Sequence, residues 1–218
     1  MSDFQQIIVW MPVLLEAAQT TVTLTAISVC AAMVLGVFLA LAKISSNPVL
    51  NKPATAYVFF FRGTPLLIQL LIIYFGLPMI NPALNLSRFM AAFIAFTLNI
   101  AAYLAEIIRA AIQSIDKGQM EASRSLGLTY GQAMRLVVIP QSYRRMIPPI
   151  CNEFVMVLKD TALVAFIALP DLTFQARQIS SSQATALVYI PALFIYLVLT
   201  AVFTFIFNKL EKRFSVYE

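Results

Sequence analysis

The sequence contains no histidine, only two cysteines and few charged residues. Without histidine, the chain cannot form an imidazole zinc site, a Ser-His-Asp or Cys-His catalytic set, or a histidine proton relay. Cys30 and Cys151 both lie in apolar segments, and two cysteines cannot supply a disulfide framework or a four-ligand metal site. The 6 glycines include no Gly-x-x-x-x-Gly-Lys-Ser/Thr motif, so the chain has no P-loop for ATP. Most enzyme classes are therefore disfavoured.

Apolar residues dominate the chain. Of its 218 residues, 61% are hydrophobic and 11% are charged, and the mean hydropathy is +0.84. This composition is typical of an integral membrane protein. The net charge of +5 is dispersed between apolar segments, whereas a nucleic-acid-binding face would concentrate Lys and Arg on a soluble surface. Because the first basic residue, Lys43, follows the first long apolar stretch, we expect that stretch to remain as a membrane span rather than a cleaved signal peptide.

Five stretches are long and apolar enough to cross about 30 Å of hydrocarbon, which takes roughly 20 residues. They are residues 17–42, 63–87, 89–112, 142–169 and a segment within 178–208. The aromatic run before residue 63 indicates that the second helix begins earlier, which would place Arg62 inside the membrane. Gly36 and neighbouring small residues in the first stretch are suited to close helix packing. Because sustained alternation of apolar and polar residues is absent, the expected fold is all-α, with five transmembrane helices in one domain, residues 1–218.

The distribution of Lys and Arg predicts the orientation. Counted over short loops and span ends, one side of the membrane has eleven of these residues and the other has only Arg88 and Arg177. The basic side is expected to be cytoplasmic, which places the N-terminus outside and the C-terminus inside. Residues 1–16, which include Phe4 and Trp10, are predicted to lie along the outer interface.

The only substantial cytoplasmic loop, residues 113–141, is long for a simple connection. Its sequence predicts a short helix over 121–126, a break at Gly127, and a second helix over 129–138 that Pro140 stops. The pair is either a solvated helical hairpin or a docking element.

Several motifs resemble the permeases of ATP-binding-cassette importers. Glu121-Ala122-Ser123, Gly127 and Ile139-Pro140 are similar to the EAA loop of that family, with Ser123 in place of the usual second alanine. Three further stretches resemble its polar amino-acid branch (histidine, glutamine or arginine type): Phe61-Arg62-Gly63-Thr64-Pro65-Leu66-Leu67, Ala105-Glu106-Ile107-Ile108-Arg109, and Asn152-Glu153-Phe154 with Leu158-Lys159-Asp160-Thr161. Together these motifs cover residues 57–170, more than half of the chain.

The resemblance implies a subunit of a larger assembly in the cytoplasmic (inner) membrane of a prokaryote. Its partners would be two ATPase subunits that bind ATP and Mg, a second identical or homologous permease subunit, an extracytoplasmic amino-acid-binding protein, and membrane lipid. This chain itself would hold no cofactor or metal. The loop helix would insert into a groove on the ATPase, where Glu121 and Arg124 make polar contacts, Ala122 and Ser123 permit close approach, and Gly127 allows the turn.

Charged residues inside the fourth span are candidates for substrate contact, because an ionised group in hydrocarbon needs a partner or a cavity. Glu153 and Asp160 are seven residues apart, so their carboxylates share one helix face. Glu153 needs a positive partner, either a substrate cation or Arg62 of the second span. Lys159 and Asp160 either bind substrate or have structural roles, with Lys159 pairing with an acid on another helix and Asp160 capping a helix break.

Two polar positions on other spans could face the same cavity. Pro65 frees a backbone carbonyl, so the second span can unwind and offer Thr64 to a ligand, although such a proline is more often only a kink. Asn99 and Tyr103 form a polar stripe on the third span. The structural alternative for Asn99 is an interhelical hydrogen bond.

We therefore predict the transmembrane subunit of an ATP-driven importer that moves polar amino acids by alternating access. The acidic residue Glu153 favours a basic substrate such as arginine, lysine or histidine, with Lys159 or backbone N–H groups as partners for its carboxylate. Within the family, a glutamine or glutamate permease fits equally well. Outside it, the alternatives are a gradient-driven carrier or channel that uses Glu153 and Asp160, and a membrane enzyme, which lacks an accompanying nucleophile, metal set or histidine.

Overall fold

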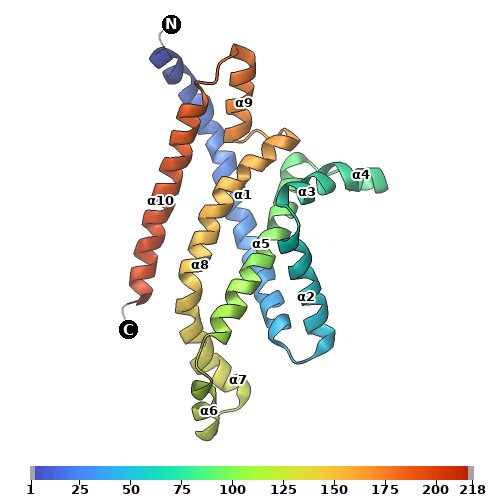
Figure 1. Ribbon diagram of the computed structural model, residues 1–218, viewed down its shortest axis with the longest axis vertical. Helices are drawn as coiled ribbons and strands as arrows, with labels where there is room; N and C mark the ends of the chain where they lie inside the picture. Colours follow the sequence, from blue (N-terminus) through green and yellow to red (C-terminus); the bar gives the residue numbers. More distant parts are fainter. Residues whose placement is uncertain (1–2, 216–218) are drawn as a thin grey trace.

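The computed structural model describes residues 3–215, and this range contains helices and no β-strand (Figure 1). The predicted all-α class is therefore confirmed. Residues 1–2 and 216–218 of the predicted single domain lie outside the described residues. The helices surround three apolar clusters that follow one another along the long axis, and α1, α5 and α8 contribute to the two that lie nearest the loop helices.

The first helix, α1 (Asp3–Ile44), is continuous for 42 residues. Residues 3–16, which were predicted to lie along the outer interface, are continuous with the rest of this helix, and their position relative to the interface stays a prediction. Trp10 and Leu14 are buried in a cluster with α9 (Leu172–Gln183) and α10 (Tyr189–Ser215), because the apolar side chains of those helices cover them. The Trp10 indole donates a hydrogen bond to Gln183 Oε1 at 3.1 Å. The side chain of Phe4 lies outside the described residues.

The second predicted span is broken rather than straight. Helix α2 (Pro48–Gly63) ends where Thr64 and Pro65 adopt extended backbone angles. The chain continues as α3 (Leu66–Leu71), the π-helical η1 (Ile72–Gly76), α4 (Leu77–Ile80) and the 3₁₀ turn η2 (Pro82–Leu84). The two halves are bent by 102°. The predicted unwinding before Pro65 is confirmed, and it turns the following helices sideways out of the bundle (Figure 1).

The central helix is α5 (Arg88–Gln113), whose start is capped by Ser87. It is rich in buried alanine, and it packs most extensively against α1. A Cβ atom added at Gly36 of α1 would lie 3.0 Å from Leu104 Cβ and 3.3 Å from the Ala101 carbonyl oxygen. The predicted use of Gly36 for close helix packing is therefore confirmed.

Two short helices form the loop at one end of the molecule, α6 (Lys117–Ser125) and α7 (Tyr130–Ala133). The π-helical η3 (Met134–Val138) joins α7 to α8 (Ile139–Asp160), and every junction residue has α-helical backbone angles. The prediction that Pro140 stops the second loop helix is wrong. Pro140 lies in the first turn of α8, and the wider π-turn before it relieves the clash that proline makes with the preceding turn.

The last third of the chain contains one helix more than predicted. After Asp160 the backbone tightens into the 3₁₀ helix η4 (Thr161–Ile167), and Ala168 is left-handed, with φ of 56°. Helix α9 follows as a separate element capped by Asp171, so only α10 represents the predicted fifth span. Helix α9 lies beside the N-terminal end of α1, at the opposite end from α6 and α7 (Figure 1).

By length and composition, three of the described helices could cross a membrane, or four if α2 and the bent segment after it form one span. The three are within α1, α5 and α10. Helix α8 is not among them, because it carries several charged residues, yet it packs between α5 and α10. The five predicted spans thus correspond to α1, the bent segment formed by α2 and the helices after it, α5, α8 and α10.

Candidate functional site

A cavity of about 350 Å³ opens where the break in the second span faces α5 and α8. Five of the six side chains predicted to contact substrate line it: Arg62, Thr64, Asn99, Glu153 and Asp160. Apolar and small residues complete the wall, among them Pro65, Ile100 and Met156. The bend therefore positions the end of α2, the middle of α5 and the last turns of α8 around one space.

The two carboxylates of α8 lie on the same wall of this cavity, as their spacing of seven residues predicts. Glu153 is half-buried and has no hydrogen-bond or salt-bridge partner among residues 3–215. Asp160 precedes the first turn of η4 without capping it through its side chain. The alternative role of Asp160 as a helix cap is therefore wrong, and both carboxylates remain available within the cavity.

Lys159 is exposed and does not line the cavity, because it lies 100° around α8 from Asp160. The described part of the chain provides no salt bridge for it. The structure thus supports neither the pairing of Lys159 with an acid of another helix nor its contact with a ligand in this cavity.

A network of amides holds the break in place. Asn99 Nδ2 donates to the Phe61 carbonyl oxygen at 2.9 Å and to Gln69 Oε1 at 3.0 Å. Gln69 Nε2 donates to the carbonyl oxygens of Phe61 and Thr64, each at 3.1 Å, and to Thr64 Oγ1 at 2.7 Å. These bonds satisfy carbonyls that the helix break would otherwise leave unpaired. Asn99 therefore makes the interhelical hydrogen bond that was its structural alternative, while its side chain still borders the cavity.

Gln69 was missed by sequence reasoning. It is 5% exposed, and it is a lone polar residue within an apolar run. A polar side chain that interrupts such a run four residues after a proline is the signal that could have identified it, because a buried amide needs partners and a broken helix supplies free carbonyls.

Arg62 forms its salt bridge with Glu106 and not with Glu153, although its charge still attracts the Glu153 carboxylate. Its Nη1 lies 3.8 Å from Glu106 Oε2, and its guanidinium stacks 5.2 Å from the centre of the Tyr103 ring. Lys43 of α1 binds Glu106 Oε1, and Arg109 Nη2 donates to Glu106 Oε2 at 2.8 Å. Glu106 thus joins three helices. The sequence offered only its three-residue spacing from Arg109 as a signal.

The loop helices present an exposed surface at the end of the molecule opposite to the N-terminus (Figure 1). Glu121, Ala122 and Arg124 of α6 are exposed, as is Leu126 after it. Gly127 has φ of 86°, and the N–H of Leu128 donates to the Ser123 carbonyl oxygen at 3.2 Å, so the turn is a Schellman motif. The predicted helix break and turn at Gly127 are therefore confirmed.

Ser123 differs from the other loop candidates. It is 5% exposed, and its hydroxyl donates to the Gln119 carbonyl oxygen at 2.6 Å. Ser123 is therefore buried within the chain itself, and its role in the close approach of a partner stays a prediction.

The sequence and the fold of this chain are similar to those of known proteins. The family of binding-protein-dependent transport system inner membrane components matches residues 32–216. The chain belongs to this family. The permease is 39% identical over 212 residues to the arginine transport system permease protein ArtQ of Bacillus subtilis (strain 168), covering 97% of this chain and 96% of ArtQ.

Two further similarities bear on the type of permease. It is 42% identical over 194 residues to the probable glutamine ABC transporter permease protein GlnM of the same strain, covering 88% of this chain and 89% of GlnM. The crystal structure of an amino acid ABC transporter with histidines matches with a TM-score of 0.92 and 40% identity, covering 98% of this chain and 99% of that one.

The predicted resemblance to permeases of amino-acid ABC transporters is therefore confirmed. Such permeases are embedded in the membrane, and the ATPase activity of the transporter lies in a separate subunit.

Proposed function

We propose that the permease imports basic amino acids, and that Glu153 and Asp160 bind the cationic groups of the substrate. The observation that carries this proposal is the pair of carboxylates in a cavity of about 350 Å³, where Glu153 forms no hydrogen bond or salt bridge with a cation of the described residues. A carboxylate in a membrane domain is costly unless a cation approaches it, and a transported cation satisfies that need.

The charges of the cavity complement those of a basic amino acid. Its wall carries two carboxylates and one guanidinium, from Glu153, Asp160 and Arg62. An amino acid such as arginine or lysine carries two cationic groups and one carboxylate, so each of its charges can meet an opposite one. Glutamine has only one cationic group, and glutamate adds a second carboxylate, which the acidic wall disfavours. The structural relative determined with histidines also fits a basic substrate.

A glutamine permease is the second candidate, because GlnM is among the similar proteins. In that case one of the two carboxylates would lack a partner in the substrate. The relative responses to arginine and glutamine therefore separate the two candidates.

The proposed assembly has two permease subunits, identical or homologous, and two ATPase subunits that hold ATP and Mg. An extracytoplasmic binding protein delivers the amino acid, and the chain acts as a single permease domain in the inner membrane of a prokaryote. The N-terminus lies outside, and the loop of α6 and α7 faces the cytoplasm. Glu121, Ala122 and Arg124 contact the ATPase, and Gly127 shapes the turn that presents them. Because the loop is ordered and joined to α8, movement of the ATPase subunits can change which side of the membrane the cavity faces.

The test is ATPase activity of the complex in liposomes, with the matching binding protein and a panel of amino acids. We expect arginine, lysine or histidine to stimulate the wild type more than glutamine does. Glu153→Gln should reduce that stimulation on the order of tenfold, because a charge-assisted contact is lost. Glu16→Gln is the matched control, since Glu16 is exposed and distant in the chain from the cavity residues.

Unchanged stimulation of Glu153→Gln would assign Glu153 to packing. Stimulation by glutamine alone would select the glutamine permease. Uptake without ATP would revive the gradient-driven carrier and overturn the importer assignment.

A further inference from the structure

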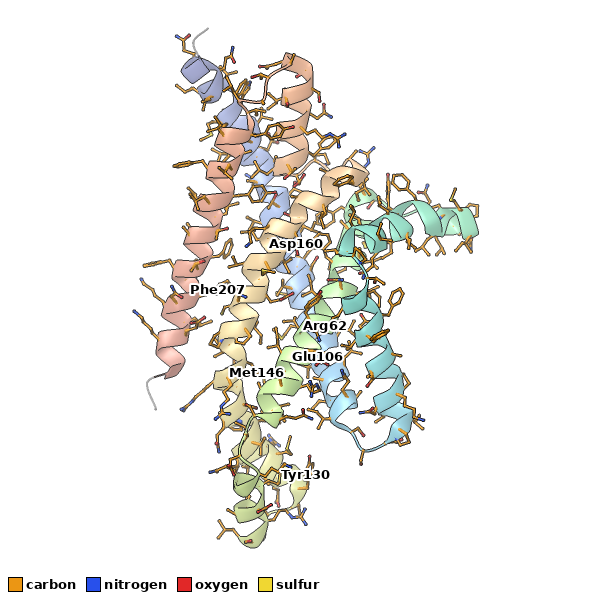
Figure 2. The ribbon with its side chains drawn as sticks, viewed as in Figure 1. Arg62, Glu106, Tyr130, Met146, Asp160 and Phe207 are labelled. Carbon is orange, nitrogen blue, oxygen red and sulfur yellow. The ribbon has the colours of Figure 1, made fainter. Side chains whose placement is uncertain are left out.

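A second cavity, of about 440 Å³, adjoins the first. Arg62, Gly63 and Tyr103 line both cavities, whereas Lys43 and Glu106 line only the second. Figure 2 shows the labelled side chains Asp160, Arg62, Glu106 and Tyr130 in this order along the long axis. The second cavity therefore lies between the first cavity and the loop helices.

The second cavity has an excess of positive charge. Glu106 is the only carboxylate in its wall, whereas Lys43 and Arg62 are both cationic. The two oxygens of Glu106 are already engaged, Oε1 by Lys43 and Oε2 by Arg109 from outside the cavity. Three cations thus surround one carboxylate, and the cluster attracts an anion.

Arg62 has donors to spare for such an anion. Its Nη1 is 3.8 Å from Glu106 Oε2, which is beyond hydrogen-bond distance, and within residues 3–215 its guanidinium donates no hydrogen bond. The side chain is 43% exposed, at the boundary between the cavities. A guanidinium presents a planar fork of donors that matches a carboxylate, so this is the arrangement that suits a carboxylate ligand.

We propose that the second cavity is a release subsite, in which Arg62 and Lys43 bind the α-carboxylate of the amino acid after it leaves Glu153 and Asp160. This inference rests on the proposed function, namely transport of an amino acid toward a cytoplasmic loop. The α-carboxylate is common to all α-amino acids, so the subsite serves any side chain, and selectivity stays with the acidic first cavity. Arg62 belongs to both cavities and can hold the carboxylate during the transfer.

The test uses the whole complex in liposomes loaded with ATP, with labelled amino acid and binding protein outside. Lys43→Gln removes a cation from the second cavity, while Glu106 keeps Arg109 as a partner. We expect its maximal uptake rate to fall on the order of tenfold, because a hydrogen bond to a charged group is lost. The half-saturating concentration of loaded binding protein should not change, since the first cavity is intact. The matched control is Lys52→Gln, an exposed lysine that lines neither cavity.

Liposomes preloaded with acetate or with chloride distinguish a site for carboxylates from a site for any anion. Acetate inside should slow uptake by the wild type and have little effect on Lys43→Gln, whereas chloride at equal ionic strength should slow neither. Equal inhibition by chloride would mean a general anion site and would overturn the assignment to a carboxylate.

Arg62→Lys provides a second variant that does not remove a principal partner of Glu106. It keeps the charge and loses the fork of donors, so uptake should fall severalfold. Wild-type uptake in both Lys43→Gln and Arg62→Lys would overturn the proposal. So would a raised half-saturating concentration at an unchanged maximal rate for Lys43→Gln, because that result would place Lys43 at the first cavity. If the wild type carries glutamine and no basic amino acid, the proposed specificity fails, but the release subsite can still be tested. The uptake of glutamine, which has the same α-carboxylate, is then compared between Lys43→Gln and Lys52→Gln.

Discussion

Glu106 and Glu153 are the same type of residue in the same helical bundle, yet their surroundings are opposite. Glu106 has two hydrogen-bonded cations and a third within 4 Å, drawn from α1, α2 and α5. Glu153 borders a cavity and has no such partner in the described part of the chain. Both carboxylates need positive charge, because ionised groups are costly in a membrane domain. The difference indicates that Glu106 joins helices, whereas Glu153 is left for a ligand.

The strongest test of this comparison is the stability of Glu106→Gln beside that of Glu153→Gln. We predict that Glu106→Gln lowers the free energy of unfolding by about 2–4 kcal/mol, because it leaves three cations, two of them partly buried, without their carboxylate. Glu153→Gln should leave stability unchanged or raise it, since an unpaired charge is removed. Thermal unfolding of the purified complex, compared between the two variants and the wild type, measures both.

Glu16→Gln again serves as the control and should not shift the unfolding temperature, because Glu16 is exposed. A loss of stability in Glu153→Gln as large as that in Glu106→Gln would remove the distinction between the two carboxylates.

A smaller effect is expected from Gln69→Leu, which tests the amide network at the break in the second span. The side chain of Gln69 bonds to Phe61, Thr64 and Asn99, so its loss leaves buried polar groups unsatisfied. We predict a decrease of about 1–3 kcal/mol in the free energy of unfolding. Uptake should fall as well, because the break carries Arg62 and Thr64. Gln178→Leu, at an exposed position on α9, is the matched control. Unchanged stability and uptake in Gln69→Leu would show that the amide network does not hold the break.

The smallest effect is expected at Asp171. Its surroundings are intermediate between those of Glu106 and Glu153, because its buried carboxyl has hydrogen bonds but no salt bridge among residues 3–215. Its Oδ1 accepts from the Phe174 N–H at 2.8 Å, and the Tyr196 hydroxyl lies 3.5 Å from Oδ2. Burial raises the pKa of Asp171 from 3.8 to about 6. The folded state therefore keeps a proton that the unfolded state has lost, and this contribution to stability is full below pH 3.8 and disappears as the pH rises through about 6.

We predict that Asp171→Asn removes this dependence, because asparagine retains the cap on α9 and does not titrate. Between pH 5 and 7 the wild type should lose on the order of 1 kcal/mol more stability than the variant. Unfolding temperatures of both proteins across this range measure the difference. Parallel curves would show that Asp171 does not titrate there.

The sequence allowed the shared helix face of Glu153 and Asp160 to be predicted, but not the ion pairs of Glu106. Glu153 and Asp160 share a helix, so their common face follows from helical periodicity alone. The break before Pro65 and the turn at Gly127 follow from the backbone requirements of those residues. The partner of Arg62 could not be predicted, because its contact with Glu106 depends on how α2 packs against α5. The burial of Ser123 and the continuation of the helix past Pro140 likewise depend on packing and on a π-turn that no local pattern indicated.

The uninterrupted helical backbone from Tyr130 to Asp160 has a consequence for how force reaches the cavity. A helix of that length spans about 45 Å, and its side chains extend about 6 Å from its axis. If the loop end is twisted by about 20°, the carboxylates at the other end move sideways by about 2 Å without any bending or shortening of the helix. Such a displacement is enough to break a hydrogen bond to a bound ligand. Torque applied at the loop would therefore shift the two carboxylates of Glu153 and Asp160 directly, although they lie at the far end of the helix from that loop.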